Sequence, residues 1–162
     1  MKRKPRSSTD GIFANGAGLD MIWQGIYIAI VELAAYLIGY KIETGTFAGI
    51  IGGPVCVNAM AMVFVTASFA EMICALCMRS RRGSIFSAHM LKNINWWLVG
   101  ALVVTVILTL AAVLVPGLQT VFGIEPGTFT GEELRISVAL AISIVPAFEL
   151  GKAIHRAWAK ES

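Results

Sequence analysis

Charged side chains are scarce in this sequence. Lysine, arginine, aspartate and glutamate make up 14% of its 162 residues, whereas 57% are hydrophobic. Soluble globular domains carry about a quarter of their residues as charged side chains, so the composition argues against an ordinary soluble fold. The mean hydropathy is +0.75, and several apolar runs are long enough to cross a bilayer. The sequence therefore predicts a polytopic membrane protein.

The positive charge that is present does not point to nucleic acid. The formal net charge is +3, but the cations cluster beside the apolar runs, as loop charges that orient membrane helices do. We expect no nucleic-acid partner. A cleavable signal peptide is not expected either, because the first apolar segment follows a polar arm of about 18 residues.

Cysteine is also rare, with Cys56, Cys74 and Cys77 as the three examples. The last two form a CxxC pattern inside an apolar run. A redox or zinc function would need access to water and further ligands, which such a position does not offer. We interpret these cysteines as packing residues.

Apolar runs separated by polar, glycine-rich or proline-rich stretches predict the architecture, an all-α membrane protein with four transmembrane helices in a bundle. The expected spans are residues 21–40, 55–78, 96–115 and 134–154, flanked by an arm (1–20) and a tail (155–162). Lys41–Pro54 and Pro116–Glu133 are expected to be loops.

The fourth span carries three local signals. Thr130 followed by Glu133 predicts a capping box, and Pro146 predicts a kink. Glu149 and Lys152 can pair at positions i and i+3, with Lys152 reaching towards the membrane interface.

The distribution of cations predicts the orientation. Four lie in the N-terminal arm, four in the connector 79–95 and three at the C-terminal end (Lys152, Arg156 and Lys160), which gives eleven on one side of the membrane. Only Lys41 and Arg135 fall on the other side. The positive-inside rule therefore predicts that both termini are cytoplasmic.

Glu71 is an acid within the second apolar run, about 10 Å along the helix from Met78. A carboxylate at that depth costs at least about 2.5 kcal/mol, so it must face protein, water or a cation. Ser68 lies three residues earlier on the same side and offers a second oxygen. Two interpretations stay open from position alone: an ion ligand, or a protonated glutamate bonded to a neighbouring helix.

Glu32 is the corresponding acid of the first run. It lies on a stripe of small and aromatic residues, Gly25, Ala29, Tyr36 and Gly39. Small residues allow helices to approach closely, so we expect Glu32 to face the bundle. A structural hydrogen bond, with Tyr36 as the nearest candidate, is favoured over a function in transport.

With the spans placed, three segments carry a resemblance to a known family. These are FVTASFAEMICALCMRS, NINWWLVGALVVTVIL and SIVPAFELGKAIHRAW, preceded by the arm MKRKPR and GIF. The order resembles the C-terminal transmembrane domain of P-type cation-transporting ATPases, membrane helices seven to ten. The closest branch is the calcium pumps of the sarco/endoplasmic reticulum type and their bacterial relatives.

The resemblance implies a function for Glu71. It matches the eighth-helix position that supplies a carboxylate to one calcium site, and Ser68 would be a weaker oxygen donor beside it. Calcium takes six to eight oxygen ligands, so this pair alone cannot complete a site. In the family the other ligands come from helices four, five and six. Glu32 matches no family ligand.

The sequence contains no DKTG phosphorylation motif, nucleotide-binding domain or actuator domain. The chain is therefore expected to be a fragment or split subunit that is not an enzyme on its own. ATP and magnesium would be bound by the missing domains, and the partners would be those domains and the lipid bilayer of a bacterial plasma membrane. The alternative hypothesis is a stand-alone four-helix protein acting as a regulatory subunit or small channel.

Overall fold

The computed structural model describes residues 17–53, 55–78 and 95–161, and this part of the chain contains helices but no strands. The helices are α1 (Ala17–Thr44), α2 (Val57–Met78), α4 (Trp96–Leu114), α5 (Pro116–Val121), α6 (Gly131–Ile142) and α7 (Ile144–Glu161). Four helical segments are long and apolar enough to cross a membrane: Met21–Thr44, Val57–Met78, Trp96–Leu114 and Gly131–Ile154. The predicted all-α membrane fold is thus confirmed.

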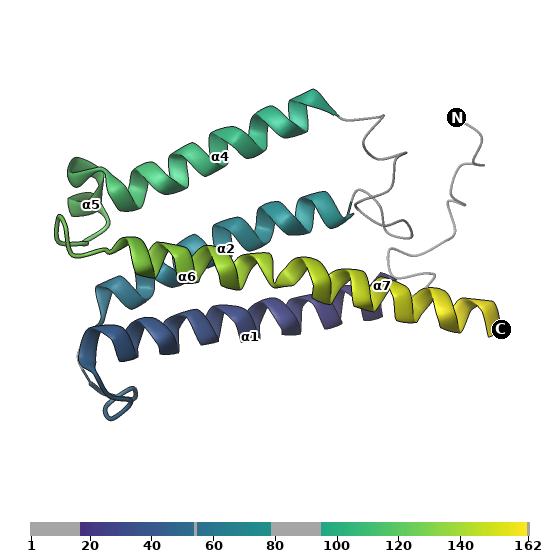
Figure 1. The fold of residues 1–162 in the computed structure, drawn as a ribbon, viewed down its shortest axis with the longest axis horizontal. Helices are drawn as coiled ribbons and strands as arrows, with labels where there is room; N and C mark the ends of the chain where they lie inside the picture. The colour runs from purple at the N-terminus through teal and green to yellow at the C-terminus, as the bar shows by residue number, and fades with distance from the viewer. Residues whose placement is uncertain (1–16, 54, 79–94, 162) are drawn as a thin grey trace.

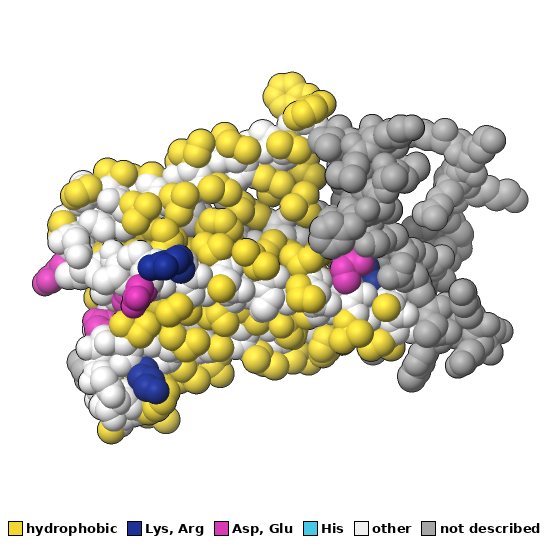
Figure 2. All heavy atoms as spheres, in the orientation of Figure 1, with side chains coloured by type: hydrophobic (Ala, Val, Ile, Leu, Met, Phe, Trp, Pro, Cys, Tyr) yellow, Lys and Arg dark blue, Asp and Glu magenta, His cyan; other side chains and the backbone are white. Residues whose placement is uncertain are grey.

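The membrane-length segments run side by side in alternating directions (Figure 1). The start of α1, the end of α2, the start of α4 and the end of α7 lie at one end of the bundle. α2 is the central element, since it contacts α1, α4, α6 and α7. Apolar side chains cover the middle of the face shown in Figure 2, and charged side chains gather towards its ends. This distribution fits helices that cross a bilayer.

The core lies around α2 in three clusters. The cluster nearest α5 contains Met62, Val65, Val113 and Phe129, together with Ala61 and Ile124. A second, towards the opposite end, contains Val31, Ala70, Cys77, Ile144 and Phe148. A small third one joins Tyr40 to Cys56 and Ala59, where α1 meets the start of α2. The cysteines Cys56 and Cys77 are buried, as expected for packing residues.

The loops differ from the prediction at two places. Lys41 to Thr44 extend α1 rather than beginning a loop. The stretch after Pro116 forms the short helix α5. Val115 is extended because the following proline disfavours the helical conformation, and Pro116 then starts α5 at a position where its missing N–H costs nothing. These changes lengthen α1 and add the short helix α5 without altering the topology.

The local signals in the fourth span are confirmed. The hydroxyl of Thr130 accepts a hydrogen bond from the backbone N–H of Glu133, whose carboxylate accepts from the N–H of Thr130 at 2.6 Å. This capping box starts α6 at Gly131, three residues earlier than expected. The span is broken at Ser143, three residues before Pro146, which is the kink that the proline predicts.

α4 stands apart from the other helices along most of its length. Its buried residues, Thr109, Ala112 and Val113, all lie in its last six positions. Trp96 and Trp97 at its start are 77% and 90% exposed, and Figure 1 shows that this end diverges from α2. Among the described residues, α4 is therefore buried at one end only.

Candidate functional site

α2 presents one exposed stripe, which we call the Glu71 stripe. Its members lie three, four or seven residues apart, so they share one side of the helix. They are Met60, Phe64, Glu71, Ala75 and Met78. The buried residues Ala59, Met62, Thr66 and Ala70 point instead towards α1 and α6. Glu71 is the sole charged member of an otherwise apolar stripe.

Glu71 is exposed in the structure, so the described helices of this chain do not bury it. The reason is the rotation of α2: its small residues face the core, and Glu71 lies roughly a third of a turn away from Ala70 and Ala59. Within the described residues, no hydrogen bond or ion pair involves the carboxylate of Glu71. The described helices therefore do not satisfy this carboxylate with a hydrogen bond.

Ser68 lies at the edge of the Glu71 stripe and is half-buried. Its hydroxyl donates to the carbonyl oxygen of Phe64 at 2.8 Å, a common arrangement for serine in membrane helices. The hydroxyl oxygen keeps its lone pairs and can still act as a ligand. Ser68 and Glu71 thus face the same region from one helix, as their spacing predicts.

The described helices bring too few carboxylates together for a complete cation site. Among the described residues, no three His, Cys, Asp or Glu side chains come together. Calcium requires six to eight oxygens, so a site at Glu71 needs ligands from outside the described helices.

Glu32 is half-buried on α1 and does not join Glu71. Among the described residues it forms no hydrogen bond with Tyr36, whose ring packs against Tyr40 at a centroid distance of 6.2 Å. Only part of the predicted small-residue stripe packs: Gly39 is buried, whereas Gly25 and Ala29 are exposed. The proposed bond to Tyr36 was therefore wrong, and Glu32 lies at the edge of the packed face.

The two ends of α2 are held by charged side chains from other helices. At its start, the carboxylate of Glu43 accepts a hydrogen bond from the N–H of Ala59 at 3.4 Å. At its end, the ammonium of Lys152 donates to the carbonyl oxygen of Cys77 at 3.3 Å. Both signs suit the helix dipole, which is positive at the start and negative at the end. Sequence reasoning missed both contacts, because the partners are distant in the chain.

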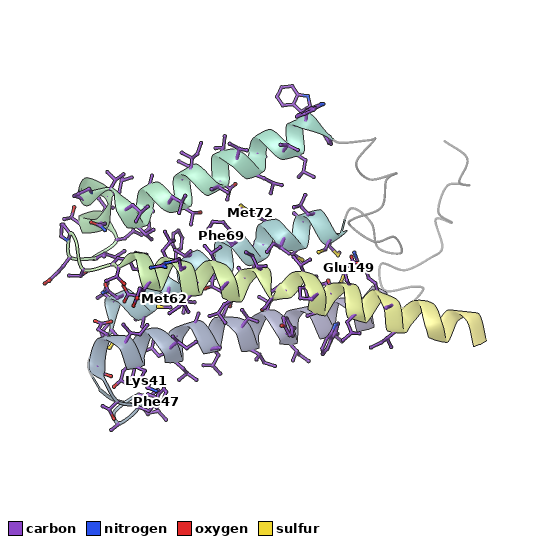
Figure 3. All side chains as sticks on the ribbon, viewed as in Figure 1. Lys41, Phe47, Met62, Phe69, Met72 and Glu149 are labelled. Carbon is purple, nitrogen blue, oxygen red and sulfur yellow. The ribbon has the colours of Figure 1, made fainter. Side chains whose placement is uncertain are left out.

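Glu149 positions Lys152. Its carboxylate lies 3.1 Å from the Lys152 ammonium, which confirms the pair predicted from the i, i+3 spacing. Lys152 is only 8% exposed, however, so it turns inward to α2 instead of reaching the membrane interface. Figure 3 shows Glu149 near the end of α2. The inward turn places the Lys152 ammonium beside Cys77, which lies six residues beyond Glu71 on α2.

Cys56 lies just before the span Val57–Met78, next to Glu43. Burial raises the pKa of its thiol, and the negative charge and hydrogen bonding of Glu43 raise it further. Cys56 is therefore held as a neutral thiol, which suits packing better than metal binding.

Comparison with known proteins identifies the family of this chain. Residues 1–154 match the family described as "Cation transporting ATPase, C-terminus". The chain belongs to this family. It is a multi-pass integral membrane protein and corresponds to the C-terminal domain of these ATPases.

Individual relatives agree with this assignment. The chain is 29% identical to Calcium-transporting ATPase 1 of Bacillus cereus over 90% of its own length and 16% of the relative's. It is 29% identical to a calcium-transporting ATPase of Listeria monocytogenes over 99% of its length and 16% of that protein. It is 28% identical to the calcium-transporting ATPase of Bacillus subtilis over 93% of its own length and 15% of that protein. The chain therefore spans about one sixth of the length of these curated relatives.

Proposed function

We propose that this chain forms the C-terminal membrane part of an ATP-driven pump that moves calcium across a bacterial plasma membrane. The carboxylate of Glu71 serves as one ligand of the transported ion, with the Ser68 hydroxyl as a weaker donor. ATP and magnesium bind to parts of the pump outside this chain, so the chain does not hydrolyse ATP alone. Its partners are the bilayer and the remaining pump helices.

One observation carries the proposal: an exposed carboxylate in the membrane span of α2, on an otherwise apolar stripe. If this stripe faced lipid, the charge would cost about 2.5–3.5 kcal/mol. Helices of the remaining pump that pack on the Glu71 stripe remove that cost when they bring oxygens and a cation to the carboxylate. The names of the relatives support calcium as that cation.

The orientation follows from the cation distribution, eleven against two. Both termini lie in the cytoplasm, and the turn between α1 and α2 and the segment from α5 to α6 lie outside. The start of α1 and the end of α7 share one end of the bundle, as this arrangement requires (Figure 1).

The test is Glu71→Gln in a complete pump that contains this chain. The amide keeps the size and the hydrogen-bonding capacity but removes the charge. We expect the calcium concentration for half-maximal ATPase activation to rise by about tenfold or more, since ligand charge sets calcium affinity. Phosphorylation by inorganic phosphate, which needs no calcium at this site, should persist.

Glu32→Gln is the matched control, because it removes an acid from the middle of another membrane span without touching the Glu71 stripe. Its calcium activation should equal that of the unmodified pump. Unchanged calcium dependence in Glu71→Gln would show that the charge is dispensable and would refute the assignment.

A further inference from the structure

We infer that Lys152 is a positioning residue for Glu71, acting through the end of α2. This inference rests on the proposed function, because it concerns the geometry of the same ion ligand. Lys152 contacts the backbone of α2 rather than Glu71 or the cation. It fixes the segment of α2 that carries the carboxylate.

The geometry of the contact supports a positional effect. The Lys152 ammonium donates to the carbonyl oxygen of Cys77, a residue 75 positions away in sequence. Cys77 follows Glu71 by six residues, or about 9 Å along the helix. A fixed carbonyl at this point restrains both the rotation and the axial position of α2. Less than two turns of helix then separate the restraint from the ligand.

The contact is also well shielded. Lys152 is 8% exposed, and Cys77 is 1% exposed. A buried ammonium needs compensation, and the carboxylate of Glu149 provides it at 3.1 Å. Cys77 packs in the cluster with Phe148 and Ile144, so apolar contacts surround the polar one. The unit of Glu149, Lys152 and Cys77 therefore joins α7 to α2 rigidly.

Glu43 provides an internal comparison. It also contacts α2, but at the start of the helix through Ala59, twelve residues before Glu71 or about 18 Å away. Its carboxylate is exposed, unlike the Lys152 ammonium. Both residues stabilise α2 through its dipole, whereas only Lys152 acts close to the carboxylate. Substitutions of Lys152 and of Glu43 can therefore separate stabilisation of the helix from positioning of the ligand.

The experiment measures calcium activation of the complete pump with Lys152→Met, which keeps the apolar stem and removes the charge. We expect the calcium concentration for half-maximal activation to rise about tenfold, comparable to the loss of an orienting partner at other metal sites. Phosphorylation by inorganic phosphate should remain, which shows that the protein is folded. Lys152→Arg, which retains a charged donor, should restore most of the affinity.

A double variant tests the route of the effect. If Lys152 acts through Glu71, adding Lys152→Met to Glu71→Gln should produce no further loss of calcium affinity. Glu43→Gln should leave calcium affinity near that of the unmodified pump. Arg135→Met, which removes an exposed cation from α6, should do the same.

Several outcomes would overturn the inference. One is a normal calcium dependence in Lys152→Met, and another is an equal shift in Glu43→Gln, which would indicate general stabilisation of α2. If the losses of calcium affinity caused by Lys152→Met and Glu71→Gln add fully in the double variant, that result would also contradict it. If Glu71→Gln itself has no effect, the proposed function fails and this inference fails with it. If Glu71→Gln has its effect but Lys152→Met does not, only the positioning role is refuted.

Discussion

Gly39 of α1 packs directly against Ala59 of α2. A Cβ atom at Gly39 would lie 2.7 Å from the Cα of Ala59 and 2.9 Å from the sulfur of Met62. Both distances are shorter than side chains tolerate, and one involves backbone that cannot move aside. The separation of α1 and α2 is therefore set by the absence of a side chain at Gly39, as in other close helix contacts in membranes.

Replacing Gly39 should accordingly destabilise the bundle. We expect Gly39→Leu to lower the free energy of unfolding by about 1–3 kcal/mol, because overpacking forces the helices apart. Unfolding of the purified protein in detergent, followed by helical circular dichroism, measures this effect. Gly25→Leu is the control, since a Cβ at Gly25 meets nothing within 4 Å. Equal stability of the two variants would refute the close-contact interpretation.

The break between α6 and α7 is joined to α1 by Tyr27. Its hydroxyl lies 3.4 Å from both the carbonyl oxygen and the hydroxyl of Ser143. Tyr27→Phe should cost about 0.6 kcal/mol, the average for hydrogen bonds between membrane helices. The same unfolding measurement in detergent checks it. Tyr36→Phe removes a hydroxyl with no hydrogen bond among the described residues and should cost less; the opposite ranking would contradict the assignment.

The thiol of Cys56 should react slowly with water-soluble maleimides near pH 8. Burial and the charge of Glu43 raise its pKa, so the reactive thiolate is rare at this pH. The labelling rate should increase as the pH rises. Glu43→Gln should accelerate labelling, because loss of the negative charge lowers the pKa. The measurement uses protein in which Cys74 and Cys77 are replaced by alanine.

A cysteine introduced at the exposed position Ala48, in protein with all three native cysteines replaced, is the reference for this experiment. It should react faster than Cys56 at each pH. Equal rates for the two positions would show that the Cys56 thiol is not shielded and that its pKa is not raised.

The predicted orientation can be tested in sealed cells. Cysteines replacing Ala48 or Glu125 should react with an impermeant maleimide added outside, because both positions lie in exposed segments at the end of the bundle that the cation distribution places outside. A cysteine replacing Ser162 should react only after the membrane is opened. Labelling of position 162 in intact cells would reverse the orientation.

Features with a local cause could be predicted from the sequence. The capping box of Thr130 and Glu133 and the break near Pro146 depend on residues a few positions apart. The pair of Glu149 and Lys152 is also local, being set by the helical spacing. Four apolar runs were sufficient to predict the four spans, since a bilayer fixes their minimum length.

Features that depend on the packing of distant segments could not be predicted in this way. The contact of Lys152 with Cys77 joins residues 75 positions apart, and no local pattern indicates it. The exposure of Glu71 depends on how α2 is rotated against α1 and α6. Hydropathy alone says little about that rotation, because nearly every face of α2 is apolar. The identity of Glu71 and Ser68 as candidates was predictable, but their surroundings were not.

Among the described residues, α4 is buried against the bundle through its last six residues, whereas its first part is not. The buried end lies at Thr109, Ala112 and Val113, and the opposite end carries Trp96 and Trp97. Two indole rings at that end favour the headgroup level of a bilayer, so they help to set its depth. The free length of α4 can therefore tilt with the thickness of the bilayer while the packing of α2 against α1 and α6 is preserved.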